Sequence, residues 1–292
     1  FGTVEGMDIY YACIWGTVGA FRIGFMVVVF TLIIGLIIGC IAGYYGGVID
    51  EIMMRFTDII FAFPGLILAM ALVIALNRPW DIDNGFLALI FLVPAAIVIA
   101  ARYGFKFSTL WSVALGFFGL ICIILFRNIL KSPSLLPMTL NLTDLDKVLI
   151  ALVIVGWPGY TRVIRGEILK VKQEDYVEAA KAVGCSDLRI MIRHILPNTI
   201  YPILIIASLD IGSIVLLAAA LSFLGIGAPY GYADWGQLIS FSRDKIYAGR
   251  IEPWKYWYTF IIPGLFIAVF TLGWNLLGDA FRDILDPTLR RK

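Results

Sequence analysis

The sequence predicts an all-α protein that crosses a membrane several times. Hydrophobic residues make up 61% of the 292 residues and charged residues 15%, whereas a soluble domain is nearer half apolar and a quarter charged. Several apolar runs reach the roughly 20 residues that a helix needs to cross a bilayer. The runs are continuous rather than alternating, which excludes a transmembrane barrel. Hydrocarbon offers the backbone no partner, so each run is expected to be helical.

Seven spans are expected, all within a single membrane domain that covers residues 1–292. The five strong segments are 23–43, 57–76, 107–126, 200–224 and 258–278. Two segments are weaker: 86–101 is uncharged but short, and 148–165 is apolar only as far as Trp157. The Pro158-Gly159 pair that follows predicts a turn within the second of these.

The lysines and arginines predict the orientation, because they are enriched in cytoplasmic loops. With seven spans, one side of the membrane holds residues 44–56, 102–106, 166–199 and the tail 279–292. Most of the 23 Lys and Arg residues lie in or beside these segments, which are therefore expected in the cytoplasm. An extracytoplasmic loop is expected at 225–257, with Trp235, Trp254 and Trp257 as interfacial anchors.

The stretch "YVEAAKAVGCSDLRIMIRHILPN" (176–198) is strongly charged for a membrane protein. Residues 174–183 are compatible with a helix, and Gly184 suits a left-handed stop after it. Ser186 is a suitable N-cap for a second helix, which Pro197 is expected to end. The pattern predicts two short helices joined by a glycine turn.

Each of these two helices is expected to have distinct faces. In the second, one face is apolar and another is basic: Leu188, Met191, Ile192 and Ile195 against Arg189 and Arg193. The first helix carries small side chains, namely Ala179, Ala180 and Ala182. Such a surface suits either docking of a partner protein or attachment to the bilayer surface. The residues alone leave both interpretations open.

The spacing of Glu178-Ala179-Ala180, Gly184 and Pro197 resembles the EAA motif of binding-protein-dependent ABC importer permeases. The ending "RHILPN" (193–198) is similar to the peptide-permease branch, which includes the C-type subunits of dipeptide and oligopeptide importers. Five further blocks resemble the same branch: 42–69, 155–169, 221–227, 234–239 and 275–287. Together these blocks make the resemblance strong.

The resemblance implies a type I permease fold in the cell membrane and a set of partners. These are a second homologous permease, two cytoplasmic ABC ATPases, an extracytoplasmic solute-binding protein and membrane lipid. It further implies that residues 166–199, here named the EAA loop, dock on an ATPase. The residues implied in this coupling are Glu178, Ala179, Ala180, Gly184, Asp187, Arg189, Arg193 and Pro197. Arg189 and Arg193 would pair with acids on the ATPase or with lipid headgroups.

The sequence departs from this branch in three places. The family has a further span before a block to which "FGTVEGMD" (1–8) is similar, so we expect that the family's first span is absent. Residues 77–147 look inserted and add a hairpin (86–126), for which a peripheral, lipid-facing position is the simplest interpretation. The branch also carries a glutamate where this chain has Ala218.

Asp210 is the one full charge in the interior of a strong span, and a carboxylate there costs about 2.5–3.5 kcal/mol on insertion scales. We expect it to line the translocation pathway or the interface between permeases. The alternatives are a structural hydrogen-bonded pair and a protonated carboxyl.

The sequence predicts a transporter subunit for di- or oligopeptides, with nickel or oligosaccharides as alternative solutes. It has no GxxxxGK[ST] loop, so partner ATPases are expected to supply the energy. A secondary transporter driven by an ion gradient would require several ionisable groups within the membrane. An enzyme is disfavoured by the single histidine, and we expect no metal and no cofactor because the four cysteines are scattered singly. The net charge of +2 gives no reason to expect nucleic acid.

Overall fold

The structure is a computed structural model that describes residues 3–4, 6–76, 81–82, 138–139, 143–248 and 256–285. The chain divides into two units, one formed by residues 1–75 with 143–292 and the other by residues 76–142. In the second unit, β3 (Asp81–Ile82) pairs antiparallel with β4 (Met138–Thr139). The expected spans 86–101 and 107–126, and most of the expected insertion, lie outside the described residues.

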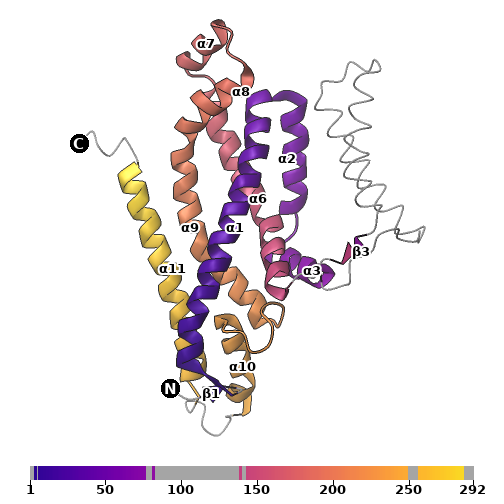
Figure 1. Cartoon of the computed structure of the whole chain (residues 1–292), viewed down its shortest axis with the longest axis vertical. Helices are drawn as coiled ribbons and strands as arrows, with labels where there is room; N and C mark the ends of the chain where they lie inside the picture. The colour runs from indigo at the N-terminus through magenta and orange to yellow at the C-terminus, as the bar shows by residue number, and fades with distance from the viewer. Residues whose placement is uncertain are drawn as a thin grey trace. The chain divides into compact units, whose positions relative to one another are not determined.

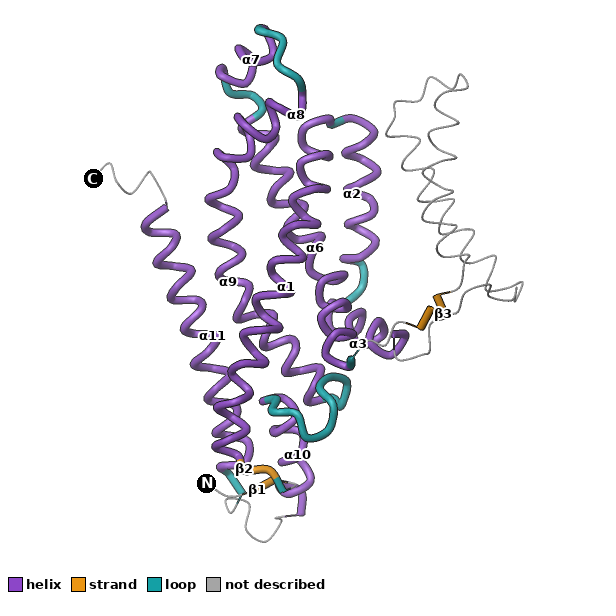
Figure 2. The backbone as a smooth tube through the Cα atoms, in the orientation of Figure 1, coloured by secondary structure: helices purple, strands orange, loops and turns teal. Residues whose placement is uncertain are grey.

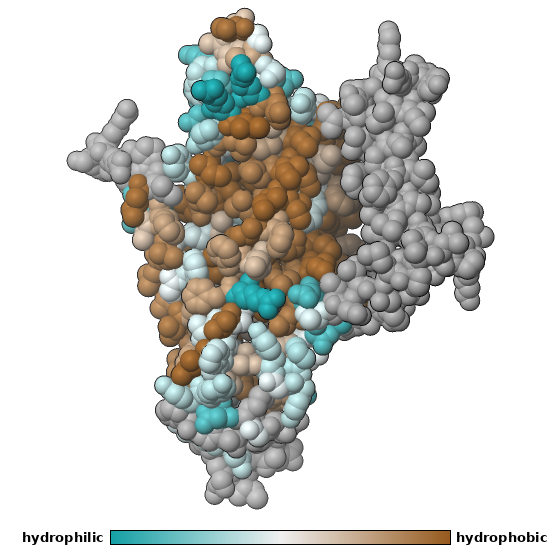
Figure 3. Space-filling model, in the orientation of Figure 1, coloured by the Kyte–Doolittle hydropathy of each residue, from teal (hydrophilic) through white to brown (hydrophobic). Residues whose placement is uncertain are grey.

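The first unit is a helix bundle (Figure 1). Its elements are β1 (Thr3–Val4), β2 (Met7–Asp8), α1 (Ile9–Tyr45), α2 (Gly47–Phe61), α3 (Gly65–Leu76), α6 (Asp144–Val171), α7 (Asp175–Ala182), α8 (Asp187–Ile190), a π-helical turn η1 (Met191–Ile195), α9 (Leu196–Phe223), α10 (Trp235–Ala248) and α11 (Tyr258–Leu285). In this unit, hydrophobic side chains form a broad band between hydrophilic groups near α7 and near α10 (Figure 3).

Helix α1 packs along α6 through a row of glycines. Gly35, Gly39 and Gly43 are four residues apart and therefore share one face. A Cβ on Gly35 would lie 2.5 Å from the Tyr160 Cβ, and one on Gly39 would lie 2.8 Å from the Ile164 Cγ2. Small residues of this kind let two helix backbones approach closely, which drives helix association in lipid.

Helix α6 runs without a break through Pro158, so the turn expected there was wrong. Its start is fixed by a capping box, in which the Thr143 hydroxyl accepts from the Asp146 amide and the Asp146 carboxylate accepts from the Thr143 amide. A proline inside a membrane helix leaves one carbonyl without its usual donor, which neighbouring helices can compensate. The carbonyl concerned is that of Ile154, and α6 continues past the proline where it packs closely against Gly35 of α1.

The segment 57–76 was expected to be one span, and the structure divides it between two helices that together are long and apolar enough for one broken span. Helix α2 ends at Phe61, and the axis of α3 is bent from it by 87°. Pro64 explains the break, because it has no amide hydrogen to continue α2 and it restricts Phe63 to extended backbone. The Pro64 carbonyl then accepts from the Leu68 amide at the start of α3. Residues 47–56, expected in a loop, belong to α2.

The four other expected spans in the described residues are confirmed by helices long and apolar enough to cross a membrane. Residues 23–43 lie in α1 and 148–165 in α6, while 200–224 and 258–278 correspond to α9 and α11. Helix α9 ends in a left-handed Gly225, where the Ile226 amide donates to the Leu221 carbonyl over 2.9 Å. The loop that follows leads to α10 (Figure 2).

The glycine contact between α1 and α6 predicts a strong effect of Gly35→Ala. The added methyl would overlap Tyr160 and press on the α6 backbone, so we expect a loss of about 1–3 kcal/mol in the free energy of unfolding. The measurement is the unfolding midpoint in detergent. Gly166→Ala in α6 is the matched control, because a Cβ there meets no atom within 4 Å. Equal midpoints for the two variants would contradict the prediction.

Candidate functional site

The EAA loop forms a compact hairpin whose first helix ends in a glycine stop. Helix α7 is followed by Gly184 at φ +82°, in the left-handed region that the sequence predicted. The Cys185 amide donates to the Ala180 carbonyl over 3.1 Å, and the Gly184 amide donates to the Lys181 carbonyl over 2.9 Å. These two bonds form a Schellman motif. The backbone therefore fixes the direction in which the chain leaves α7.

The second helix of the hairpin does not end at Pro197, as the sequence led us to expect. It begins after Ser186 and passes through η1 into α9, so residues 187–223 form one continuous helical segment. Pro197 lies in the first turn of α9. A proline in a regular helix would clash with the carbonyl four residues earlier, and the wider π-helical turn just before it relieves this conflict.

The predicted coupling residues gather at this end of the bundle. Glu178, Ala179 and Gly184 are exposed, and so are Asp187, Arg189, Arg193 and Pro197. Ala180 is half-buried and packs against the core. The hairpin is attached to the bundle by Val177 of α7, which is fully buried, and by Ile190 and Ile195 of the second helix.

The single apolar face expected on the second helix was wrong. Met191 and Ile195 are buried, but Leu188 is 65% exposed and Ile192 is 57% exposed. Val183, between the two helices, is 84% exposed. The π-helical turn shifts the register, so that Ile190 takes a buried position instead. The hairpin therefore presents three exposed aliphatic side chains among charged ones, and we name Val183, Leu188 and Ile192 the apolar tip.

Contacts that the sequence did not predict hold the hairpin in place. The Asn198 side-chain amide donates to the Tyr176 hydroxyl over 3.0 Å and to the His194 carbonyl over 2.7 Å. The Tyr44 hydroxyl at the end of α1 donates to Asp187 Oδ1 over 2.7 Å. No local pattern reveals the second contact, because its partners are 143 residues apart.

Two arginines of α6 bind carboxylates of α2. Arg165 donates to both oxygens of Asp50, and Arg162 donates to Asp58. The Arg162 guanidinium also lies 4.3 Å from the centre of the Phe61 ring. Arg162 and Arg165, which lie beside the EAA loop in the sequence, therefore form ion pairs between α6 and α2.

Asp210 lies in the middle of α9 and is half-buried. The Tyr160 hydroxyl of α6 donates to its Oδ2 over 3.0 Å. The carboxylate thus has a polar partner on a neighbouring helix, as is usual for a charged group within a membrane.

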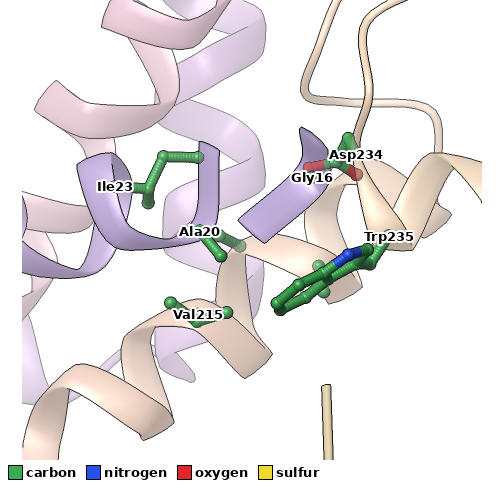
Figure 4. A pocket seen from close by; sticks show the side chains of 8 residues that line it. Gly16, Ala20, Ile23, Val215, Asp234 and Trp235 are labelled. Carbon is green, nitrogen blue, oxygen red and sulfur yellow. The ribbon is translucent and has the colours of Figure 1, made fainter. Parts of the chain in front are cut away.

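At the opposite end, Asp234 and Trp235 line a small pocket together with Gly16 of α1 and Val215 of α9 (Figure 4). The Trp235 indole donates to the Cys13 carbonyl over 2.8 Å and lies directly against Gly16 of α1. Trp235 is only 3% exposed, so its expected role as an interfacial anchor was wrong. A Cβ on Gly236 would lie 2.1 Å from the Ala219 carbonyl oxygen.

Asp234 caps α10 by accepting from the Gln237 amide over 2.9 Å. Burial raises the pKa of this carboxyl, while hydrogen bonds from Gln237, Ser222 and Gly236 act in the opposite direction. A small cavity of about 10 Å³ beside Asp234 is lined by α1 and α9. That volume is close to the minimum for a single water molecule.

Residues 35–291 match the family described as "Binding-protein-dependent transport system inner membrane component". The dipeptide transport system permease protein DppC of Alkalihalophilus pseudofirmus is 32% identical over 291 residues, which cover 99% of this chain and 72% of that protein. The probable D,D-dipeptide permease DdpC of Escherichia coli is 32% identical over 98% of this chain and 72% of its own length. The glutathione permease GsiD of Pectobacterium atrosepticum is 29% identical over 98% of this chain and 71% of its own length.

A crystal structure described as an amino acid ABC transporter with histidines shares the fold. It is 16% identical, its TM-score is 0.50, and the match covers 97% of this chain and 95% of that chain. The family match and the apolar helices identify a multi-pass protein of the inner membrane. Members of the family work with ATPase and substrate-binding partners. The chain belongs to the inner membrane components of binding-protein-dependent transport systems and is a permease subunit of an ABC importer.

Proposed function

We propose that this permease carries di- or oligopeptides and forms half of a translocation pathway with a second, homologous permease. On this proposal, two cytoplasmic ABC ATPases supply the energy, and an extracytoplasmic binding protein delivers the solute. The observation that carries the proposal is the exposed hairpin of the EAA loop in a chain about 30% identical to peptide permeases.

The hairpin has the properties of a docking surface. Its apolar tip is exposed, which is expensive in water and favourable against an apolar pocket on a partner. Glu178, Arg189 and Arg193 are exposed on the same hairpin and would set the register of docking more than its affinity. The Schellman motif and the buried Val177 hold this surface in shape before the partner binds, which lowers the entropy lost on binding.

Docking through the apolar tip predicts that Val183→Asp will release the ATPase. Placing a carboxylate in a dry interface costs far more than losing the valine contact, so we expect at least about a tenfold fall in co-purified ATPase. Tyr230→Asp is the control, because Tyr230 is 72% exposed and belongs to the loop at the opposite end of the bundle. Retention of the ATPase by Val183→Asp would count against docking at the tip.

The solute is proposed from the relatives, whose names specify dipeptides, D,D-dipeptides and glutathione. All three are short chains of amide-linked amino acids. Mass spectrometry of the native ligand carried by the cognate binding protein tests this proposal. We expect the native ligand to be a short peptide. In an uptake assay, we expect an unlabelled dipeptide to compete with a labelled form of that peptide. Recovery of a nickel complex or an oligosaccharide would replace the peptide assignment while leaving the transporter type intact.

We propose further that the charge of Asp210 serves the translocation pathway or the interface between permeases. Asp210→Asn removes the charge but keeps an oxygen that can accept from Tyr160, whereas Tyr160→Phe removes the hydrogen bond but keeps the charge. We expect Asp210→Asn to reduce uptake or assembly at least about fivefold, and Tyr160→Phe to have the smaller effect. Wild-type uptake and assembly in Asp210→Asn would refute the proposal. A larger effect of Tyr160→Phe would favour a structural pair.

A further inference from the structure

Tyr44 joins three parts of the first unit that are distant in the sequence. It lies at the end of α1, is only 5% exposed, and donates its hydroxyl to Asp187 Oδ1 over 2.7 Å. Asp187 is the first residue of α8, directly after the glycine turn of the EAA loop. A hydrogen bond to a charged acceptor is stronger and shorter than one between neutral groups. The Tyr44 hydroxyl therefore links α1 directly to the EAA loop.

The end of α6 is held by the same tyrosine. The Lys172 ammonium, at the C-cap of α6, donates to the Tyr44 carbonyl. It also lies 5.6 Å from the centre of the Tyr44 ring, within the range of a cation–π interaction. Lys172 directly follows α6 within the EAA loop, and Asp187 begins the helix that leads back to α9. The segments that precede and follow α7 therefore both contact Tyr44 of α1.

The hydrogen bond between Tyr44 and Asp187 connects α1 to the EAA loop, to which α1 is not joined directly along the chain. The backbone joins the EAA loop only to α6 and α9, whereas α1 lies far away in the sequence. Helix α1 packs against α6 through Gly35 and Gly39, against α9 through Gly24, and against Trp235 through Gly16. A displacement passed to the end of α1 would therefore act on packing contacts along the length of the bundle.

The turn beside Tyr44 is formed by two glycines. Gly46 and Gly47 both have positive φ, at +67° and +58°, and a Cβ on either would meet no atom within 4 Å. Beyond the turn, Asp50 of α2 is bound by Arg165 of α6. The end of α1 is thus linked to α6 on both sides of a glycine turn that carries no side chains of its own.

We propose that Tyr44 is a positioning residue that passes movement of the EAA loop to α1, acting through Asp187. This inference rests on the proposed docking of an ATPase at the EAA loop. The contact between Tyr44 and Asp187 lies within the permease, so its loss should leave ATPase binding in place. Its loss should instead uncouple the two activities, so that more ATP is hydrolysed for each solute molecule transported.

The test uses the complete transporter, with its ATPases and binding protein, reconstituted in lipid vesicles. We expect Tyr44→Phe to raise the ratio of ATP hydrolysed to solute transported about threefold or more, with the amount of bound ATPase unchanged. Tyr45→Phe is the matched control, because this neighbouring tyrosine is 46% exposed. A merely structural role would lower both activities together and leave the ratio where it was.

A variant of Asp187 tests the same contact from its exposed side. Asp187→Ala removes the acceptor of the Tyr44 hydroxyl and should raise the ratio as much as Tyr44→Phe does. The double variant Tyr44→Phe/Asp187→Ala should add nothing further, because both changes break one bond.

A wild-type ratio in Tyr44→Phe, or additive effects in the double variant, would overturn the inference alone. Absence of the ATPase from the wild-type complex would overturn the proposed function and this inference with it.

Discussion

The close approach of α1 and α6 is the constraint on which the rest of the first unit depends. In lipid, apolar side chains gain little by leaving a surround as apolar as themselves, so tight packing and hydrogen bonds must hold helices together. Gly35 and Gly39 bring the two backbones into contact beside Pro158, where α6 continues as a helix. Because α6 leads into the EAA loop, the position of the hairpin depends on glycines buried far from it.

The two ends of the bundle are fastened in different ways. Near α10, Trp235 and Gly236 fit tightly against α1 and α9, and they leave little freedom for movement. Near the EAA loop, ion pairs and hydrogen bonds such as Arg165 with Asp50 and Tyr44 with Asp187 add to the buried contacts of Val177, Ile190 and Ile195. Polar contacts of this kind can exchange partners without opening a cavity. The end near the EAA loop therefore has contacts that can rearrange, whereas the end near α10 is held by packing alone at Gly236.

Local signals predicted much of the fold. Apolar runs located α1, α6, α9 and α11, and glycine chemistry located the turn at Gly184, because each of these depends on neighbouring residues alone. The failures came where tertiary contacts decided the outcome. Pro158 and Pro197 do not end helices, since packing against α1 and a π-helical turn accommodate them. The partners of Tyr44 and Asp210 could not be foreseen, because pairing between distant helices leaves no mark in either segment.

The π-helical turn η1 links the hairpin to the membrane in a way that side-chain chemistry does not reveal. Each residue of a helix advances the chain by about 100° around its axis. The extra residue in this turn therefore sets the angle between the face of α8 that bears Leu188 and the face of α9 that enters the bundle. Deleting a residue of η1 other than Ile192 would preserve every side chain of the apolar tip and still turn Val183 and Leu188 in another direction. The orientation of the hairpin relative to α9 therefore depends on the number of residues from Met191 to Ile195 as well as on their identity.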